Sequence, residues 1–160
     1  MAIAPNTTFV IGQVLTAAQT NAFPFGNVAL ASSATTYTMT TAAVQTTGMT
    51  VSWTAIANRN YKITYYEPQV TTPSTLSGYT TLRLYENSVA TGPQLQQGFV
   101  QNSAAVALSG SLTLTYVGTF SAGTRTVIGA GLASSVTGVP IAGRSAVSKA
   151  FLLVEDLGPA

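Results

Sequence analysis

The segment LTLTY, residues 112–116, decides the class of fold that this chain adopts. Its apolar side chains recur at every second position, so Leu112, Leu114 and Tyr116 are expected on one face of a strand and the threonines on the other. The same alternation occurs in residues 51–55, 61–65 and 80–85. The pattern predicts half-buried β-strands, with Leu82 and Leu84 on one face and Arg83 on the other in the last of these segments.

Three further strands are expected at residues 94–100, 124–129 and 151–155, the last of them apolar on both faces and therefore central or covered. Turn signals separate these runs at residues 58–60, 68–78, 91–93, 109–110 and 121–123. Connections this short favour antiparallel pairing, because parallel strands need crossovers of about a dozen residues or more. We therefore predict an all-β fold, an antiparallel two-sheet sandwich with jelly-roll-like topology.

The chain is poor in ionised groups. Only 6% of its 160 residues are charged, against roughly 25% in an ordinary globular domain. A free monomer usually keeps itself soluble with interspersed charges, whereas the cores of protein interfaces are depleted of charge. The composition favours extensive burial in an oligomer or a larger assembly, and the alternative is a monomer coated with threonine.

Several classes of function are not indicated. Histidine and cysteine are absent, and the four carboxylates are Glu67, Glu86, Glu155 and Asp156. Glu155 and Asp156 are neighbours on a predicted strand, so in a regular strand they point to opposite faces and do not form a catalytic pair. Either is expected to pair with a cation such as Lys149 or Arg144 or to stay solvated. No serine-nucleophile or calcium-loop motif occurs, and the sequence predicts no enzyme, no metal and no cofactor.

Nucleic acid and membrane partners are not expected either. The six cations are scattered, whereas a nucleic-acid footprint needs a concentrated basic patch. No run approaches the roughly 20 apolar residues of a membrane span, and the N-terminus lacks the features of a secretory signal, so we expect a chain that is made and left in the cytosol.

Aromatic side chains allow one alternative. Tyr66 and Tyr85 are out of phase with the apolar faces of their strands, so both are candidates for exposed glycan contacts, alongside Trp53, Tyr61 and Tyr65. Packing in the core or at a subunit interface is the competing interpretation, and it is favoured because alternating aromatics are ordinary strand residues.

The stretch FVIGQVLTAAQTNAFPFG, residues 9–26, differs from the rest of the chain. Its segment TAAQ, residues 16–19, fits a capping box, which predicts one or two helical turns that begin at Leu15 or Thr16 and end before Pro24. So short an element cannot hide its own apolar side chains, so they are expected to dock on another surface: Phe9, Val10, Val14, Leu15, Phe23 and Phe25.

Two motifs carry a resemblance to a known family. Residues 9–21 resemble the F-x-x-G-x-V-L-T-A-A-x-x-N start of short structural proteins of tailed bacteriophages, many of them minor tail proteins, and Asn21 closes that motif. Residues 150–159, AFLLVEDLGP, resemble the LVED-x-GP ending of such proteins. The resemblance implies an N-terminal attachment segment, residues 1–26, and a β-sandwich body, residues 27–160, that is commonly trimeric.

The resulting hypothesis is a non-enzymatic virion structural protein, synthesised in the host cytoplasm. It is expected to attach to other virion proteins at the tail tip or as capsid decoration and to self-associate as a homotrimer. The alternative hypotheses are a host-glycan-binding module of the virion and a hydrolase of cell-wall polymer.

Overall fold

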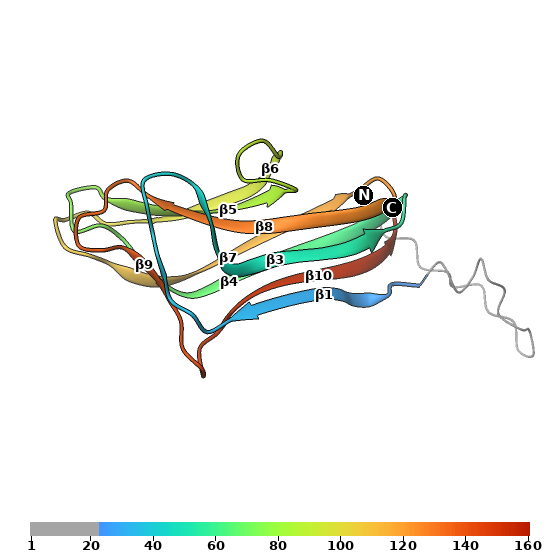
Figure 1. Cartoon of the computed structure of the whole chain (residues 1–160), viewed down its shortest axis with the longest axis horizontal. Coiled ribbons are helices and arrows are strands. Elements are labelled where there is room, and N and C mark those ends of the chain that lie inside the picture. The colour runs from blue at the N-terminus through green and yellow to red at the C-terminus, as the bar shows by residue number, and fades with distance from the viewer. Residues whose placement is uncertain (1–22) are drawn as a thin grey trace, which may run out of the picture.

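The computed structural model describes residues 23–160, which form ten strands and no helix. Sheet A contains β1 (Gly26–Ser33), β2 (Tyr37–Thr38), β4 (Arg59–Thr71), β7 (Ser109–Thr119), β9 (Ile141–Gly143) and β10 (Ala150–Pro159). Sheet B contains β3 (Val44–Ala55), β5 (Tyr79–Glu86), β6 (Gln94–Gln101) and β8 (Gly123–Ala133). The sheets form two layers that run along the long axis of the molecule (Figure 1).

The strands pair in a nested order. β1 pairs with β10, β2 with β9, β3 with β8, β4 with β7 and β5 with β6, and all of these pairs are antiparallel. The chain is therefore one long ribbon that folds back on itself between β5 and β6. Additional pairing of β10 and β9 with β4, and of β8 with β5, rolls this ribbon into two sheets. The result is a jelly roll, so the predicted two-sheet antiparallel sandwich is confirmed.

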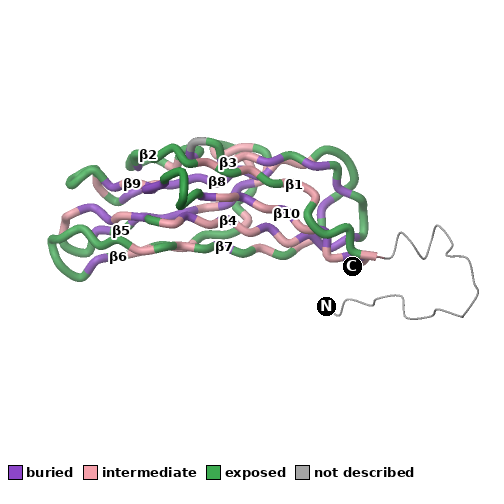
Figure 2. Tube along the Cα trace, turned by 90° about the horizontal axis from the view of Figure 1, so that it is seen from below, coloured by how far each residue is buried: buried purple, intermediate pink, exposed green. Residues whose placement is uncertain are grey.

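The core lies between the sheets and follows the alternation of the sequence. Leu114 is buried, Leu112 and Tyr116 pack against the core, and the threonines of the same strand are exposed, as the LTLTY segment predicts. Buried positions alternate with more exposed ones along the strands (Figure 2). The alternation therefore assigns each strand face correctly along most of its length.

Aromatic rings fill one end of the core. Trp53 lies with its ring centroid 5.7 Å from that of Tyr61 and 5.2 Å from that of Phe120, the second contact being edge-on. Tyr65 is fully buried further along β4. The interpretation of Trp53, Tyr61 and Tyr65 as core residues is confirmed, since none of them is available to a ligand.

Two glycines of β8 make room for large side chains of the facing sheet. A Cβ atom at Gly129 would lie 2.9 Å from the Tyr65 ring, and one at Gly131 would lie 2.5 Å from the Met39 sulfur. The Gly129-Ala-Gly131 segment is thus a place where the sheets approach closely, because no other residue leaves the space that these side chains occupy.

Two of the connections differ from the sequence prediction, and one predicted element cannot be compared. The predicted loop 68–78 is wrong at its start, because Gln69 and Val70 pair with β9 and β4 continues to Thr71. The predicted turn at 109–110 is wrong, because Ser109 and Gly110 begin β7 and pair with the end of β4. The predicted helical turns near residue 16 lie outside the described residues.

Candidate functional site

Every carboxylate side chain of the protein takes part in an ion pair within the fold. The described residues contain four such pairs: Arg144–Glu67, Arg59–Asp156, Lys62–Glu155 and Arg125–Glu86. The first two are buried between the sheets, and the other two are partly exposed. The few acidic groups of the chain are therefore used internally, and the outer surface has almost no negative charge to offer.

Arg59 begins the inner face of β4, and Glu67 lies further along the same face. The inward positions of this strand read Arg59, Tyr61, Ile63, Tyr65 and Glu67, and all five side chains are buried. Because both ionised residues share the phase of the apolar ones, the alternation in this segment is the signal that predicts their burial. The sequence analysis considered these charges only as scattered along the chain and did not predict their burial.

The Arg144–Glu67 pair is the centre of a buried network. Arg144 Nε donates to Glu67 Oε2 at 2.9 Å and Arg144 Nη2 donates to Glu67 Oε1, while the Tyr65 hydroxyl donates to Glu67 Oε1 at 2.6 Å. Thr46 Oγ1 lies 2.7 Å from the Tyr65 hydroxyl oxygen. The network joins β4 to β3 and to the segment that follows β9, so it ties both sheets together.

This environment shifts two ionisation equilibria. Burial, the Glu67 charge and the hydrogen bond to Glu67 raise the pKa of the Tyr65 hydroxyl well above its ordinary value. Burial lowers the pKa of the Arg144 guanidinium, but the hydrogen bond and charge of Glu67 outweigh burial, and the pKa is raised. Tyr65 is thus held neutral and Arg144 is held charged.

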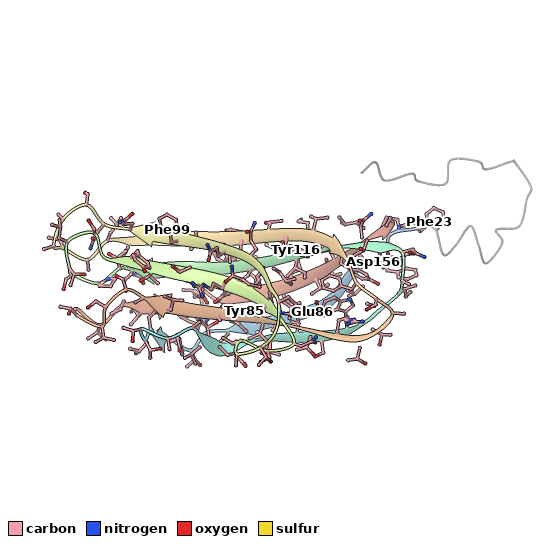
Figure 3. All side chains as sticks on the ribbon, turned by 90° about the horizontal axis from the view of Figure 1, so that it is seen from above. Phe23, Tyr85, Glu86, Phe99, Tyr116 and Asp156 are labelled. Atoms are coloured by element: carbon pink, nitrogen blue, oxygen red, sulfur yellow. The ribbon has the colours of Figure 1, made fainter. Side chains whose placement is uncertain are left out.

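The second buried pair anchors the residues that lead into β1. Arg59 Nε donates to Asp156 Oδ2 at 2.7 Å, and Arg59 Nη2 donates to Asp156 Oδ1 at 2.9 Å and also to the carbonyl oxygen of Phe23. The guanidinium carbon lies 4.2 Å from the centroid of the Phe25 ring. Phe23 and Asp156 accordingly lie at the same end of the sandwich (Figure 3).

The end of β10 is shaped around this contact. Asp156 Oδ1 also accepts the Gly158 backbone N–H at 2.7 Å, and Gly158 has a φ of 101°, in the region that favours glycine. The register of β10 against β4 shifts between the same two residues. Asp156 and Gly158 therefore work as a unit that aims the carboxylate at Arg59.

The outer face of sheet A carries apolar side chains and one neutral ion pair, together with the threonines Thr64, Thr113 and Thr115. We call the apolar side chains and the ion pair the sheet A face, and its members are Leu30, Lys62, Tyr66, Val117, Phe151, Leu153 and Glu155. Leu30 lies opposite Leu153 in the register, and the Tyr66 and Phe151 rings are 5.3 Å apart between centroids. Lys62 Nζ lies 2.9 Å from Glu155 Oε2, so the charges within the face cancel.

The predicted docking residues divide into two groups. Phe9, Val10, Val14, Leu15 and Asn21 lie outside the described residues, so their docking role stays a prediction, as does the boundary at residue 26. Phe23 and Phe25 are held on Arg59, and Phe25 remains exposed.

The two predicted glycan contacts are not on one platform. Tyr66 is half-buried on sheet A, whereas Tyr85 belongs to β5 of sheet B. The prediction that Tyr85 is exposed is wrong: only 7% of this residue is exposed, and its hydroxyl accepts a hydrogen bond from Arg83 at 3.1 Å. Tyr66 alone of the two is open to a ligand.

The adjacent acidic residues behave as the strand geometry requires. The Glu155 side chain is 26% exposed on the outer face, and the Asp156 side chain is 1% exposed on the inner face. Each of them pairs with a cation, as expected, but the cations are Lys62 and Arg59 rather than Lys149 or Arg144, because the register places β4 beside β10. Among residues 23–160, no group of three or more acidic side chains is placed to hold a metal ion.

The comparisons with known proteins concern the fold. No protein-family model and no curated protein sequence matches the chain. The globular domain of zebrafish complement 1qA is 15% identical, with a TM-score of 0.47 over 84% of this chain and 99% of that one. Murine APRIL is 9% identical, with a TM-score of 0.47 over 82% and 99%. Eiger TNF from S. frugiperda is 10% identical, with a TM-score of 0.48 over 84% and 95%.

Similarity at this level carries no functional argument, and the jelly-roll assignment rests on the strand order itself. In the part of the chain that the structure describes, no helix is long and apolar enough to cross a membrane.

Replacing either of two adjacent carboxylates tests the energetic difference between the buried and exposed pairs. We expect Asp156→Asn to lower the free energy of unfolding by about 3 kcal/mol or more, because it removes the charge that balances buried Arg59. The matched control Glu155→Gln should change it by about 1 kcal/mol or less. Urea unfolding followed by tryptophan fluorescence measures both values, and equal losses would contradict the assignment.

The Tyr65 network predicts a loss of stability at alkaline pH. The unfolded chain ionises this phenol near pH 10, while the folded protein keeps it neutral, so the stabilisation is complete below about pH 10 and falls as the pH rises further. Tyr65→Phe should reduce the slope of unfolding free energy against pH by up to about 1.4 kcal/mol per unit. Thr46→Val is the control, since it weakens the network but keeps the phenol and therefore the slope. Equal slopes for wild type and Tyr65→Phe above pH 10 would disprove the prediction.

Proposed function

We propose that the protein is a non-enzymatic structural component of a tailed-bacteriophage virion. It joins the particle, at the tail tip or as capsid decoration, through its N-terminal segment, and it self-associates as a trimer through its sandwich. The observation that carries the proposal is the distribution of charge, because all four carboxylates are consumed by internal ion pairs.

A surface of this kind suits a protein that is covered by copies and neighbours. Large apolar side chains stand exposed on the outer strands, including Leu30 at 64% and Val117 at 54%. Contiguous apolar surface on a soluble protein commonly marks an interaction site, and interface cores are depleted of charge. The sheet A face has exposed apolar side chains at both edges and only one ion pair, which is internally neutral, so no net charge repels an identical face of another copy.

The base of the N-terminal segment supports the attachment role. Phe23 and Phe25 are fixed on Arg59, and Arg59 is itself fixed by Asp156 in the core. The chain therefore enters the sandwich at a defined point rather than through a loose linker. A segment that starts from a rigid point loses less conformational freedom when it docks, which favours tight attachment.

The motifs at the two ends of the sequence give the proposal its virion setting. The resemblance of residues 9–21 and 150–159 to tailed-phage structural proteins supports that setting. A role in a symmetric particle also fits a domain that presents self-complementary faces to identical copies of itself.

Self-association is testable with substitutions on the sheet A face. Wild-type protein should sediment as a trimer, and the double variant Leu30→Ser, Val117→Thr should dissociate to monomers at the same concentration, because both changes remove apolar contact area. The control Leu76→Ser alters a loop leucine that is more exposed, at 71%, and should leave the trimer intact. A wild-type protein that stays monomeric at its highest soluble concentration would refute self-association.

Attachment is testable by removing residues 1–22, which keeps the contacts of Phe23 and Phe25 with Arg59. The truncated chain should unfold at the same urea concentration as the full chain, because the described core lies entirely in residues 23–160. It should be absent from phage particles assembled in its presence, whereas the full chain is incorporated; immunoblots of purified particles measure this. Normal incorporation of a folded truncated chain would rule out the attachment role.

A further inference from the structure

A depression of about 380 Å³ lies on the outer face of sheet B, between β5 and the edge strand β6. Three cross-strand pairs line it: Tyr79 opposite Gln101, Thr81 opposite Phe99, and Arg83 opposite Gln97. All six side chains therefore point to the same side of the sheet. Figure 3 shows Phe99 on this sheet, toward the end opposite Phe23 and Asp156.

Arg83 brings an unbalanced positive charge to this depression. Its Nη1 donates to the Tyr85 hydroxyl at 3.1 Å, and its buried Nε has no acceptor among the described residues. All four carboxylates are paired with other cations, so none is left to balance Arg83. A guanidinium presents planar N–H donors that match the geometry of a carboxylate. The Arg83 guanidinium has N–H donors that make no hydrogen bond to the described residues of the fold.

Aromatic and amide side chains complete the surroundings. Phe99 is 62% exposed and Tyr79 is 40% exposed, so two aromatic rings are open to solvent along the depression, and the pair Thr81–Phe99 is next to the pair that contains Arg83. Gln97 Oε1 accepts from Gln94, which leaves its amide N–H groups free to donate, and Gln101 Nε2 donates to the Ser77 carbonyl, which leaves its oxygen free to accept. Apolar surface combined with a few convergent polar groups is typical of small-ligand sites.

We propose that this depression binds an acidic saccharide of the uronic-acid type. The carboxylate of one sugar unit pairs with Arg83, its hydroxyls bond to Gln97, and the apolar face of its ring lies against Phe99. The next unit of the saccharide lies beside Tyr79 and Gln101, at the other end of the depression. The site lies on the sheet opposite the sheet A face, so it stays open when that face is covered. The inference does not depend on the virion role, since it rests on the charge and geometry of this sheet alone.

A saccharide fits these residues better than a second protein chain does. The depression is small, its one cation lies opposite the amide of Gln97, and the residue opposite Phe99 is the buried Thr81 rather than a large apolar side chain. A protein interface of standard size needs a broad and well-packed patch, for which six residues are too few. The protein partner is therefore the competing outcome of the test.

The test titrates the full chain by calorimetry with tetrasaccharides of galacturonate, glucuronate and mannuronate, each beside its methyl ester. At least one acid should bind saturably, and its ester should bind at least about tenfold more weakly, because the ester has no charge to pair with Arg83. Arg83→Gln should weaken the acid by a similar factor. The matched control Lys149→Gln removes the same charge elsewhere on the surface and should leave binding unchanged.

Two further variants separate loss of the site from loss of the fold. Phe99→Ala should weaken binding several-fold without changing the circular dichroism spectrum, and Arg83→Lys should bind more weakly than wild type because a lysine cannot make the planar bidentate contact. Binding of none of the acids overturns the proposal. Equal weakening by Arg83→Gln and Lys149→Gln also overturns it, since the attraction would then be non-specific. Loss of self-association in Arg83→Gln, with no saccharide bound by wild type, would instead make this face a protein contact.

Discussion

The buried guanidinium–carboxylate pairs on the inner face of β4 are the interactions on which the rest of the structure depends. β4 pairs with β7 on one side and with β10 and β9 on the other, so it occupies the centre of sheet A. Arg59 at its start is tied to β10, and Glu67 near its end is tied to Arg144 after β9. A shift of one residue in register would turn these charges to the outer face and leave their partners buried alone, which costs several kcal/mol. The pairs therefore fix one register.

The same ion pairs also determine how charge is distributed on the surface. Because the chain has only four acidic side chains, each carboxylate that pairs in the interior is absent from the surface. The outer faces of the two sheets therefore differ in net charge. The sheet A face keeps a single self-neutralising pair among apolar side chains, which suits contact with an identical surface. The outer face of sheet B keeps Arg83 without a counterion. An apolar neutral face and a cationic recessed face on opposite sides of a sandwich are suited to different partners.

The strand faces were predictable because the alternation of side chains is a local property of the sequence. The ion pairs were not predictable, because they depend on which strands lie side by side. The threonines and leucines of residues 112–116 give the correct face of β7, and the segment from Arg59 to Glu67 carries the phase that buries both of its ends. The partners of Glu155 and Asp156 depend on which strand lies beside β10, and the nested ribbon brings residues about 100 positions apart together. Tyr85 shows a second limit: it lies on the outer face as the alternation indicates, yet neighbouring side chains cover it. Strand continuations at Gln69 and Ser109 depend on distant partners as well.

The end of β10 and the residues that lead into β1 meet at Arg59, and this gives Asp156 and Gly158 a physical role. Asp156 holds the guanidinium, Gly158 adopts the positive φ that lets its N–H bond the same carboxylate, and the guanidinium holds Phe23 and Phe25. The ending of the chain thus positions the base of the segment at its beginning. Substituting Asp156 would release that base as well as unbalance the core, whereas substituting Glu155, one residue earlier, would do neither.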